Sequence, residues 1–141
     1  MFKKILVPVD GSEDSRKALK LALDIASRYS SKLTALYVVA KRVYAHIHEL
    51  GVLAMLSNEL EKEGKEVLKE AQELAKPLGL EIETKLVHGF PAEEILNMVE
   101  KESYDLVVIG SRGLSGVKAF FLGSVSDKVT HHARCSVLIV K

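Results

Sequence analysis

The feature that most restricts the fold of this sequence is its alternation of five short, β-rich apolar runs with segments of helical periodicity. This alternation is typical of βαβ units, in which helices connect parallel strands and cover both faces of the sheet. We therefore expect an α/β fold with three layers around a five-stranded parallel sheet. The expected strands are Lys4 to Val9, Lys32 to Val39, Glu81 to Val87, Leu106 to Ile109 and Ser136 to Val140.

Two long segments between these runs have the apolar spacing of amphipathic helices. In the first, apolar residues recur at helical spacing from Ala18 to Tyr29, and either Ser12 or Asp14 is available as the N-cap. In the second, an apolar stripe from Leu60 to Leu78 lies opposite a charged face, and Gly79 follows it closely. Both segments are expected to be helices that pack on the sheet.

Shorter helices are expected later in the chain, and one segment has no regular pattern. Pro91 is a favourable first residue for a helix that runs to Lys101, and a last helix is expected from Ser124 to about His132. The segment from Lys41 to Ser57 fits no clean period, so we expect a crossover loop there.

Length, charge and cysteine content narrow the class of protein. With 141 residues the chain is expected to form one domain over residues 1–141, and its net charge of +1 gives no electrostatic reason to expect nucleic acid as a partner. Cys135 is the only cysteine, which excludes an intramolecular disulfide and favours a cytoplasmic protein. No apolar run approaches the ~20 residues that cross a bilayer, so no membrane partner is expected.

Three glycines, Gly110, Gly113 and Gly123, follow the fourth expected strand and precede the last expected helix. Gly110 would let the backbone approach a ligand at the strand end, and Gly113 would permit a left-handed turn. Gly123 would precede a helix whose first N–H groups have no helical partner, which is an arrangement suited to binding an anion. The alternative interpretation, that all three are turn residues, remains open.

A second group of distinctive residues follows the first expected strand, in the run Val-Pro-Val-Asp10-Gly-Ser12. Ligands of open α/β sheets bind beyond the carboxyl ends of the strands, where the strand order reverses. If this run and the glycine loop border one crevice, the first and fourth strands are neighbours and the order is the flavodoxin-like 3-2-1-4-5. Asp10 is then either a turn residue or a carboxylate that accepts hydrogen bonds from ribose hydroxyls or an adenine amino group.

Several known phosphate sites are excluded by the sequence. A Walker A loop needs Gly-Lys-Ser/Thr, but Val117 precedes Lys118, and no G-x-G-x-x-G follows any expected strand. A receiver domain needs a phosphoacceptor aspartate after the third strand, where this chain has His88 and Gly89. These absences favour binding of a nucleotide over rapid phosphoryl transfer, and no catalytic residue is expected.

Other polar residues have weaker signals. Arg112 and Lys118 are either phosphate-binding cations or solvated loop charges. Ser124 with Asp127 has the pattern of a capping box. The histidines lack the arrangement of a metal site, and Cys135 is expected to be a small packed hydrophobe.

The spacing Gly110-x2-Gly113-x9-Gly123-Ser124, together with Val-Pro-Val-Asp10-Gly-Ser, resembles the ATP-binding branch of the universal stress protein family. The resemblance covers essentially the whole chain and implies the same strand order. It implies ATP, or another adenine nucleotide, as the ligand, with Mg or Mn held through the phosphates. The nucleotide-binding residues that it implies are Pro8, Val9, Asp10, Val38, Val39, Gly110, Arg112, Gly113, Gly123, Ser124, Val125 and Ser126.

The fifth expected strand would lie at an edge of the sheet, and its residues Val137, Leu138, Ile139 and Val140 are too apolar to leave an edge open. The resemblance also implies homodimers, so we expect a homodimer through this strand. Functionally, we expect a nucleotide-dependent sensor or switch of the stress response with at most slow hydrolysis. The alternatives are a nucleotide-independent dimeric scaffold or chaperone-like protein, and a nucleotide hydrolase whose base the sequence does not identify.

Overall fold

A five-stranded parallel sheet forms the centre of the computed structural model, which describes residues 1–41, 44–113 and 122–141. The strands are hydrogen-bonded in the order β3-β2-β1-β4-β5, which confirms the expected order. Each neighbouring pair is parallel. The strands are β1 (Lys4–Pro8), β2 (Lys32–Ala40), β3 (Glu83–Gly89), β4 (Leu106–Gly110) and β5 (Ser136–Val140).

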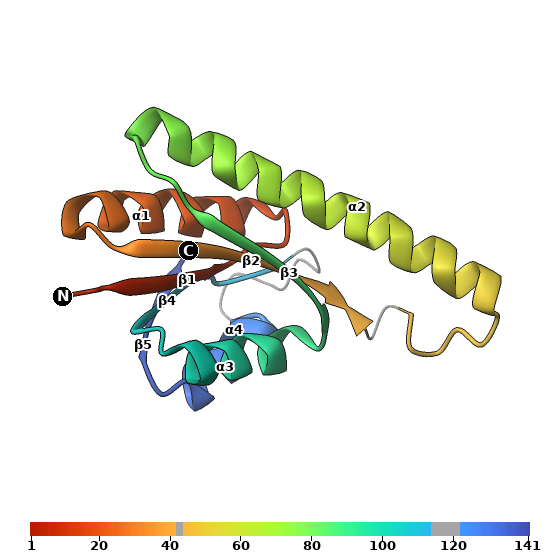
Figure 1. The fold of residues 1–141 in the computed structure, drawn as a ribbon. Coiled ribbons are helices and arrows are strands. Elements are labelled where there is room, and N and C mark those ends of the chain that lie inside the picture. The colour runs from red at the N-terminus through yellow and green to blue at the C-terminus, as the bar shows by residue number, and fades with distance from the viewer. Residues whose placement is uncertain (42–43, 114–121) are drawn as a thin grey trace.

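Helices cover both faces of this sheet, as Figure 1 shows. One face packs against α1 (Glu13–Tyr29) and α2 (Leu50–Ala75), which ends in a short 3-10 turn, η2 (Lys76–Leu78). The other face packs against α3 (Pro91–Glu102) and α4 (Ser124–His132). The three-layer α/β architecture is therefore confirmed.

The centre of the sheet is dry because its strands are apolar on both faces. Ile5, Leu6 and Val7 of β1 have no exposed surface, and all five residues of β4 are buried. This continuous apolar pattern is what a parallel strand covered on both faces requires. Within the described residues, no helix combines the length and hydropathy needed to cross a membrane.

Local capping explains where the first helix begins. Ser12, the N-cap of α1, accepts a hydrogen bond from the Ser15 N–H at 3.2 Å, so the N-cap is Ser12 and not Asp14. Asp14 lies instead in the first turn of α1, where a carboxylate interacts favourably with the helix dipole. From this position the Asp14 carboxylate can reach the side chains of Ser111 and Arg112, which follow β4.

Two expected boundaries were wrong. α2 begins at Leu50, so residues 50–57 are helical and are not part of a loop. Apolar residues in that stretch lie on several sides of the helix, which leaves no single stripe for sequence analysis to detect. β3 begins at Glu83 and not at Glu81, because its pairing with β2 starts where Glu83 lies opposite Thr34.

Candidate functional site

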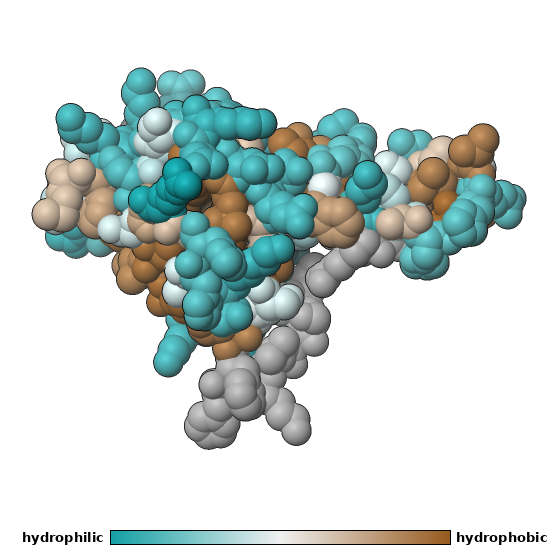
Figure 2. Space-filling model, turned by 90° about the horizontal axis from the view of Figure 1, so that it is seen from below, coloured by the Kyte–Doolittle hydropathy of each residue, from teal (hydrophilic) through white to brown (hydrophobic). Residues whose placement is uncertain are grey.

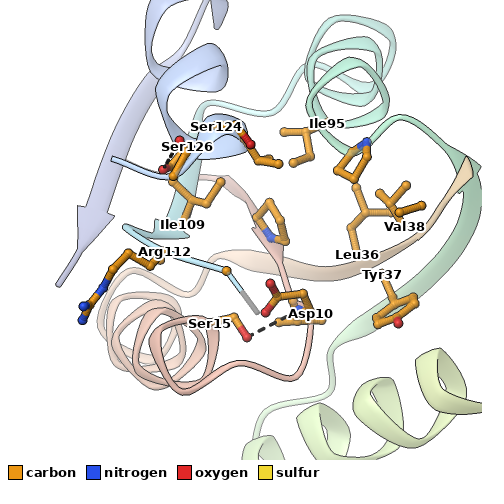
Figure 3. A pocket seen from close by; sticks show the side chains of 18 of the residues that line it. Asp10, Ser15, Leu36, Tyr37, Val38, Ile95, Ile109, Arg112, Ser124 and Ser126 are labelled. Carbon is orange, nitrogen blue, oxygen red and sulfur yellow. Dashed lines mark hydrogen bonds between the residues drawn. The ribbon is translucent and has the colours of Figure 1, made fainter. Parts of the chain in front are cut away.

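A cavity of about 460 Å³ opens at the carboxyl ends of β1, β2 and β4, where the strand order reverses (Figure 3). Its volume lies within the range of small-molecule sites. All of the residues that the sequence suggested for nucleotide binding border this cavity except Val39. Those that border it are Pro8, Val9, Asp10, Val38, Gly110, Arg112, Gly113, Gly123, Ser124, Val125 and Ser126.

Val39 is separated from the cavity by the alternation of side chains along β2. Its side chain is 1% exposed and packs in the core under α1 and α2. Val38, the next residue back, packs on the opposite face and borders the cavity.

Asp10 is fixed at the mouth of the cavity by the turn that follows β1. Its Oδ1 accepts a hydrogen bond from the Ser12 N–H at 2.9 Å, and its own N–H donates to Ser15 Oγ at 3.4 Å. A Cβ on Gly113 would lie 2.8 Å from the other carboxylate oxygen, Oδ2. Asp10 is therefore a turn residue whose carboxylate also borders the cavity.

The contacts that explain why Gly110 and Gly113 are glycines differ from the expected ones. A Cβ on Gly110 would lie 2.7 Å from the backbone carbon of Asp14, so this glycine is required for the close packing of α1 on β4. Gly113 does not have the positive φ expected for a left-handed turn. It is restricted instead by its contact with the Asp10 carboxylate.

The N-terminal end of α4 supplies backbone donors to the cavity. Gly123, and not Ser124, is the N-cap, and it forms no side-chain cap hydrogen bond, so the expected capping box is wrong. The Gly123 N–H is already used, because it donates to the Ser111 carbonyl at 2.7 Å. No described residue accepts a hydrogen bond from the N–H groups of Ser124, Val125 or Ser126, as is usual for a first helical turn.

Ser126 holds this helix end in place. Its hydroxyl is buried and lies 3.0 Å from the carbonyl oxygens of both Ser111 and Gly123. The side chain of Ser126 is thus used to join α4 to the loop after β4, and only its backbone N–H remains for a ligand.

Arg112 borders the cavity, but its guanidinium is held by α1. Arg112 Nε donates to Asp14 Oδ2 at 3.2 Å, and the Ser111 hydroxyl donates to the same oxygen at 3.1 Å. Burial raises the pKa of the Asp14 carboxyl, but these two hydrogen bonds and the positive charge of Arg112 outweigh burial and lower it. Lys118, the other basic residue considered, lies outside the described residues.

Sequence analysis did not identify the residues of the cavity wall that belong to no motif. Leu36, Pro91, Ile95 and Ile109 border the cavity with apolar side chains, and Figure 3 shows Leu36, Ile95 and Ile109 among the side chains around it. The other missed residues are Ser15, Tyr37, Ala40, Leu60 and Glu63.

One sequence signal for part of this missed wall was Gly64, a glycine in the middle of an amphipathic helix. A Cβ at Gly64 would lie 2.5 Å from the Tyr37 ring, so the glycine lets α2 lie directly on Tyr37. Glu63 and Leu60 are brought to the cavity by this close packing.

The remaining single residues behave as ordinary side chains. Cys135 is half-buried against the core under α3 and α4, as expected, and burial raises the pKa of its thiol. Among the described residues there is no group of three or more histidine, cysteine, aspartate or glutamate side chains that could hold a metal ion.

The strand order and the cavity at its switch point define a doubly wound α/β protein with a cavity at the place where open α/β sheets bind their ligands. The sequence model described as the Universal stress protein family matches residues 1–141, and the chain belongs to that family. The universal stress protein YxiE of Bacillus subtilis is 40% identical over 148 residues, covering 100% of both chains.

Solved structures agree with this assignment. The universal stress protein UspA from Lactobacillus plantarum has a TM-score of 0.87 at 29% identity and covers 99% of this chain and 98% of its own. A universal stress protein solved in complex with cAMP has a TM-score of 0.77 at 27% identity and covers 99% of this chain and 97% of its own.

Proposed function

We propose that this universal stress protein binds adenine nucleotides, with ATP as the first candidate, and acts in the cytoplasm as a nucleotide-dependent sensor or switch. One observation carries the proposal. The same cavity is bordered by the start of α4, whose first backbone N–H groups have no described acceptor, and by an apolar wall. A phosphate suits the first feature and a planar base suits the second. The cAMP complex of a family member supports this ligand class.

The proposed orientation follows from the two ends of the cavity. The phosphates lie near Gly113 and Gly123 and accept hydrogen bonds from the first N–H groups of α4. The adenosine part lies over Pro8, Val9 and Asp10. The resemblance implies Val38 or Val39, at the end of β2, as the residue whose backbone contacts the adenine edge. We assign this role to Val38, because Val38 borders the cavity.

A divalent cation would be held by the phosphates and not by a protein site. Two carboxylates, Asp10 and Glu63, border the cavity, while the guanidinium of Arg112 is already paired with Asp14. A Mg or Mn ion on the phosphate oxygens would offset these carboxylates. We therefore expect ATP to bind more tightly with Mg than without it.

We propose binding with at most slow hydrolysis. No lysine is among the described residues that border the cavity, and the sequence has no Walker A loop. Steady turnover near the roughly 1 to 100 per second of kinases would contradict this part of the proposal.

The test is calorimetric titration of ATP against the unmodified protein and Gly123→Val. A Cβ at Gly123 would already lie 3.3 Å from the Ser111 carbonyl oxygen, so valine would press on the loop that borders the phosphate end. We expect the affinity of Gly123→Val for ATP to fall about tenfold or more, which corresponds to the loss of one charge-assisted hydrogen bond.

Gly51→Val is the matched control, because a Cβ at Gly51 meets nothing within 4 Å and Gly51 does not border the cavity. This variant should bind ATP as the unmodified protein does. Equal ATP affinities for all three proteins would contradict the proposal.

A nucleotide-independent scaffold or chaperone-like protein is the second candidate. The observation that favours it is the exposed apolar end of α2, where Leu50 is 80% exposed and Met55 71% (Figure 2). Denaturing the purified protein and recording the released absorbance distinguishes the two, since only a nucleotide-binding protein would release adenine.

A further inference from the structure

The helix α2 forms a wall of the cavity that neither the turn after β1 nor the loop after β4 provides. Its backbone lies against the ring of Tyr37 at Gly64, and the preceding residue, Glu63, borders the cavity together with Leu60. The position of Glu63 is therefore set by rigid packing between a helix and the central sheet.

The face of α2 that carries Glu63 is directed toward α1 and the turn after β1. One turn further along this face, Val67 Cγ2 lies 3.3 Å from where a Cβ of Gly11 would be. Another turn on, Glu70 pairs with Arg16 of α1 at 2.9 Å. Glu63 thus lies one helical turn before Val67 and next to Gly64, which packs on Tyr37 of β2, so it is on the side of the cavity formed by β2.

Two acidic residues of α2 are engaged in ion pairs, whereas Glu63, like Glu59, Glu66 and Glu73, is in none among the described residues. Glu61 contacts His88 at 2.6 Å and Glu70 contacts Arg16, whereas Glu63 has no hydrogen bond or ion pair within the described part of the chain. Burial, followed by the negative charges of Glu63 and Asp10, raises the pKa of the Tyr37 phenol. Both carboxylates therefore act on the same end of the cavity.

The order of the strands decides which part of a nucleotide reaches Glu63. Two strand spacings of about 4.8 Å separate β4, beside the N-terminus of α4, from β2, so the cavity spans roughly 10 Å between them. With the phosphates at α4, the ribose lies over β1 and the base lies over β2, under α2.

We propose that Glu63 selects the base: its carboxylate accepts a hydrogen bond from the exocyclic amino group of adenine and rejects purines with an oxo group at that position. This inference rests on the proposed nucleotide-binding function and deepens it. An ionised carboxylate offers only acceptors, so it pairs with an amino donor and faces a 6-oxo oxygen with no proton between them. Selectivity is largest where a wrong ligand leaves such a group unpaired.

The test compares ATP with inosine triphosphate, ITP, which replaces the 6-amino group by a 6-oxo group. Affinities for both are measured by calorimetry on the unmodified protein, Glu63→Gln and Glu66→Gln. We expect the unmodified protein to prefer ATP by about tenfold or more, the value of one hydrogen bond to a charged group. In Glu63→Gln the preference should fall by about tenfold, the value of that hydrogen bond, because the amide N–H can donate to the 6-oxo group. Any preference that is left comes from the backbone of Val38 at the adenine edge.

The control Glu66→Gln makes the same change on a residue of α2 that is exposed, as Glu63 is, but does not border the cavity, and it should keep the full preference. A Glu63→Gln protein with an unchanged ATP-to-ITP ratio overturns the proposal. A third ligand, 2′-deoxy-ATP, tests the ribose: if Glu63→Gln alters only the preference for ATP over 2′-deoxy-ATP, Glu63 holds the sugar and the proposal is wrong. If the unmodified protein binds none of the three ligands, the proposed function itself fails.

Discussion

Asp14 links two parts of the chain that are far apart in sequence. From the first turn of α1 it accepts hydrogen bonds from the Ser111 hydroxyl and the Arg112 guanidinium, in the loop after β4. The Asp14 backbone also occupies the space beside Gly110 in which the side chain of any residue other than glycine would lie. Asp14 is therefore a positioning residue for the loop after β4, which borders the cavity, although Asp14 does not border the cavity itself.

The lowered pKa of Asp14 predicts how its contribution to stability depends on pH. An aspartate titrates near 3.8 in the unfolded chain, and the folded value is lower. The stabilisation is therefore complete well above pH 3.8 and is lost as the pH falls through the folded pKa. At pH 7, Asp14→Asn should lower the free energy of unfolding by about 1 to 2 kcal/mol, since Arg112 is partly exposed.

Urea denaturation at pH 7 and at pH 3 measures this effect. The difference between the two proteins should shrink at the lower pH, because Asp14 of the unfolded chain is protonated below its pKa of 3.8 and this favours unfolding. A difference that is the same at both pH values would show that the ionised carboxylate contributes nothing.

At the scale of single residues, sequence alone identified the three glycines, but the left-handed turn expected at Gly113 was wrong. Gly110 and Gly113 are explained by the atoms that lie against them, Asp14 and Asp10, which are about 100 positions away. No local propensity contains that information, because the close approach exists only after β1 and β4 have paired.

Among the elements, α2 depends most on a single small residue. Glycine in a helix interior costs about 1 kcal/mol relative to alanine, yet Gly64 lies in the middle of a 26-residue helix. The contact with Tyr37 explains the glycine, since a Cβ would overlap the ring. The close packing of α2 on β2 therefore outweighs helix propensity at this position.

We predict that Gly64→Ala destabilises the protein although alanine favours helices. Overpacking of this kind typically costs about 1 to 3 kcal/mol. Gly51→Ala, in the first turn of the same helix, has open space and should be neutral or stabilising by up to about 1 kcal/mol. Thermal denaturation of the two variants should give shifts of opposite sign, or a loss for Gly64→Ala only. A stabilised Gly64→Ala protein would refute the assigned contact.

The elements that sequence reasoning predicted well are those with one clear apolar stripe or a capping signal. α1, α3, α4 and β5 lie within about a residue of the expected bounds. The first turns of α2 were missed because Leu50, Val52 and Met55 are exposed apolar residues without periodic partners. Glu63 was missed for a related reason: its role depends on how α2 crosses the sheet, which sequence spacing does not determine.

At the scale of the whole molecule, the two edges of the sheet differ in composition. β3 carries Glu83 and Lys85, and charges of this kind discourage edge-to-edge pairing. In β5, four apolar residues follow Ser136, and each is only half-buried in the single chain. The β5 edge is the one that a second chain would cover.

We predict that the protein is a homodimer through β5. Light scattering at micromolar concentration should give a mass near twice the 15.5 kDa of one chain. Placing lysine at Leu138 should shift the equilibrium toward monomer, whereas the same change at Thr84, within the β3 edge, should not. A monomeric unmodified protein would contradict the prediction.

The central position of β1 has a consequence for how the protein is made. β1 is synthesised first, and β2 follows it closely, but its other neighbour, β4, begins only at Leu106. Until that strand leaves the ribosome, one side of β1 exposes unpaired backbone groups of a largely apolar strand. During translation the nascent chain is therefore open to incorrect pairing for most of its length, and the ligand cavity is completed only when the last segment, from Gly110 onward, has emerged.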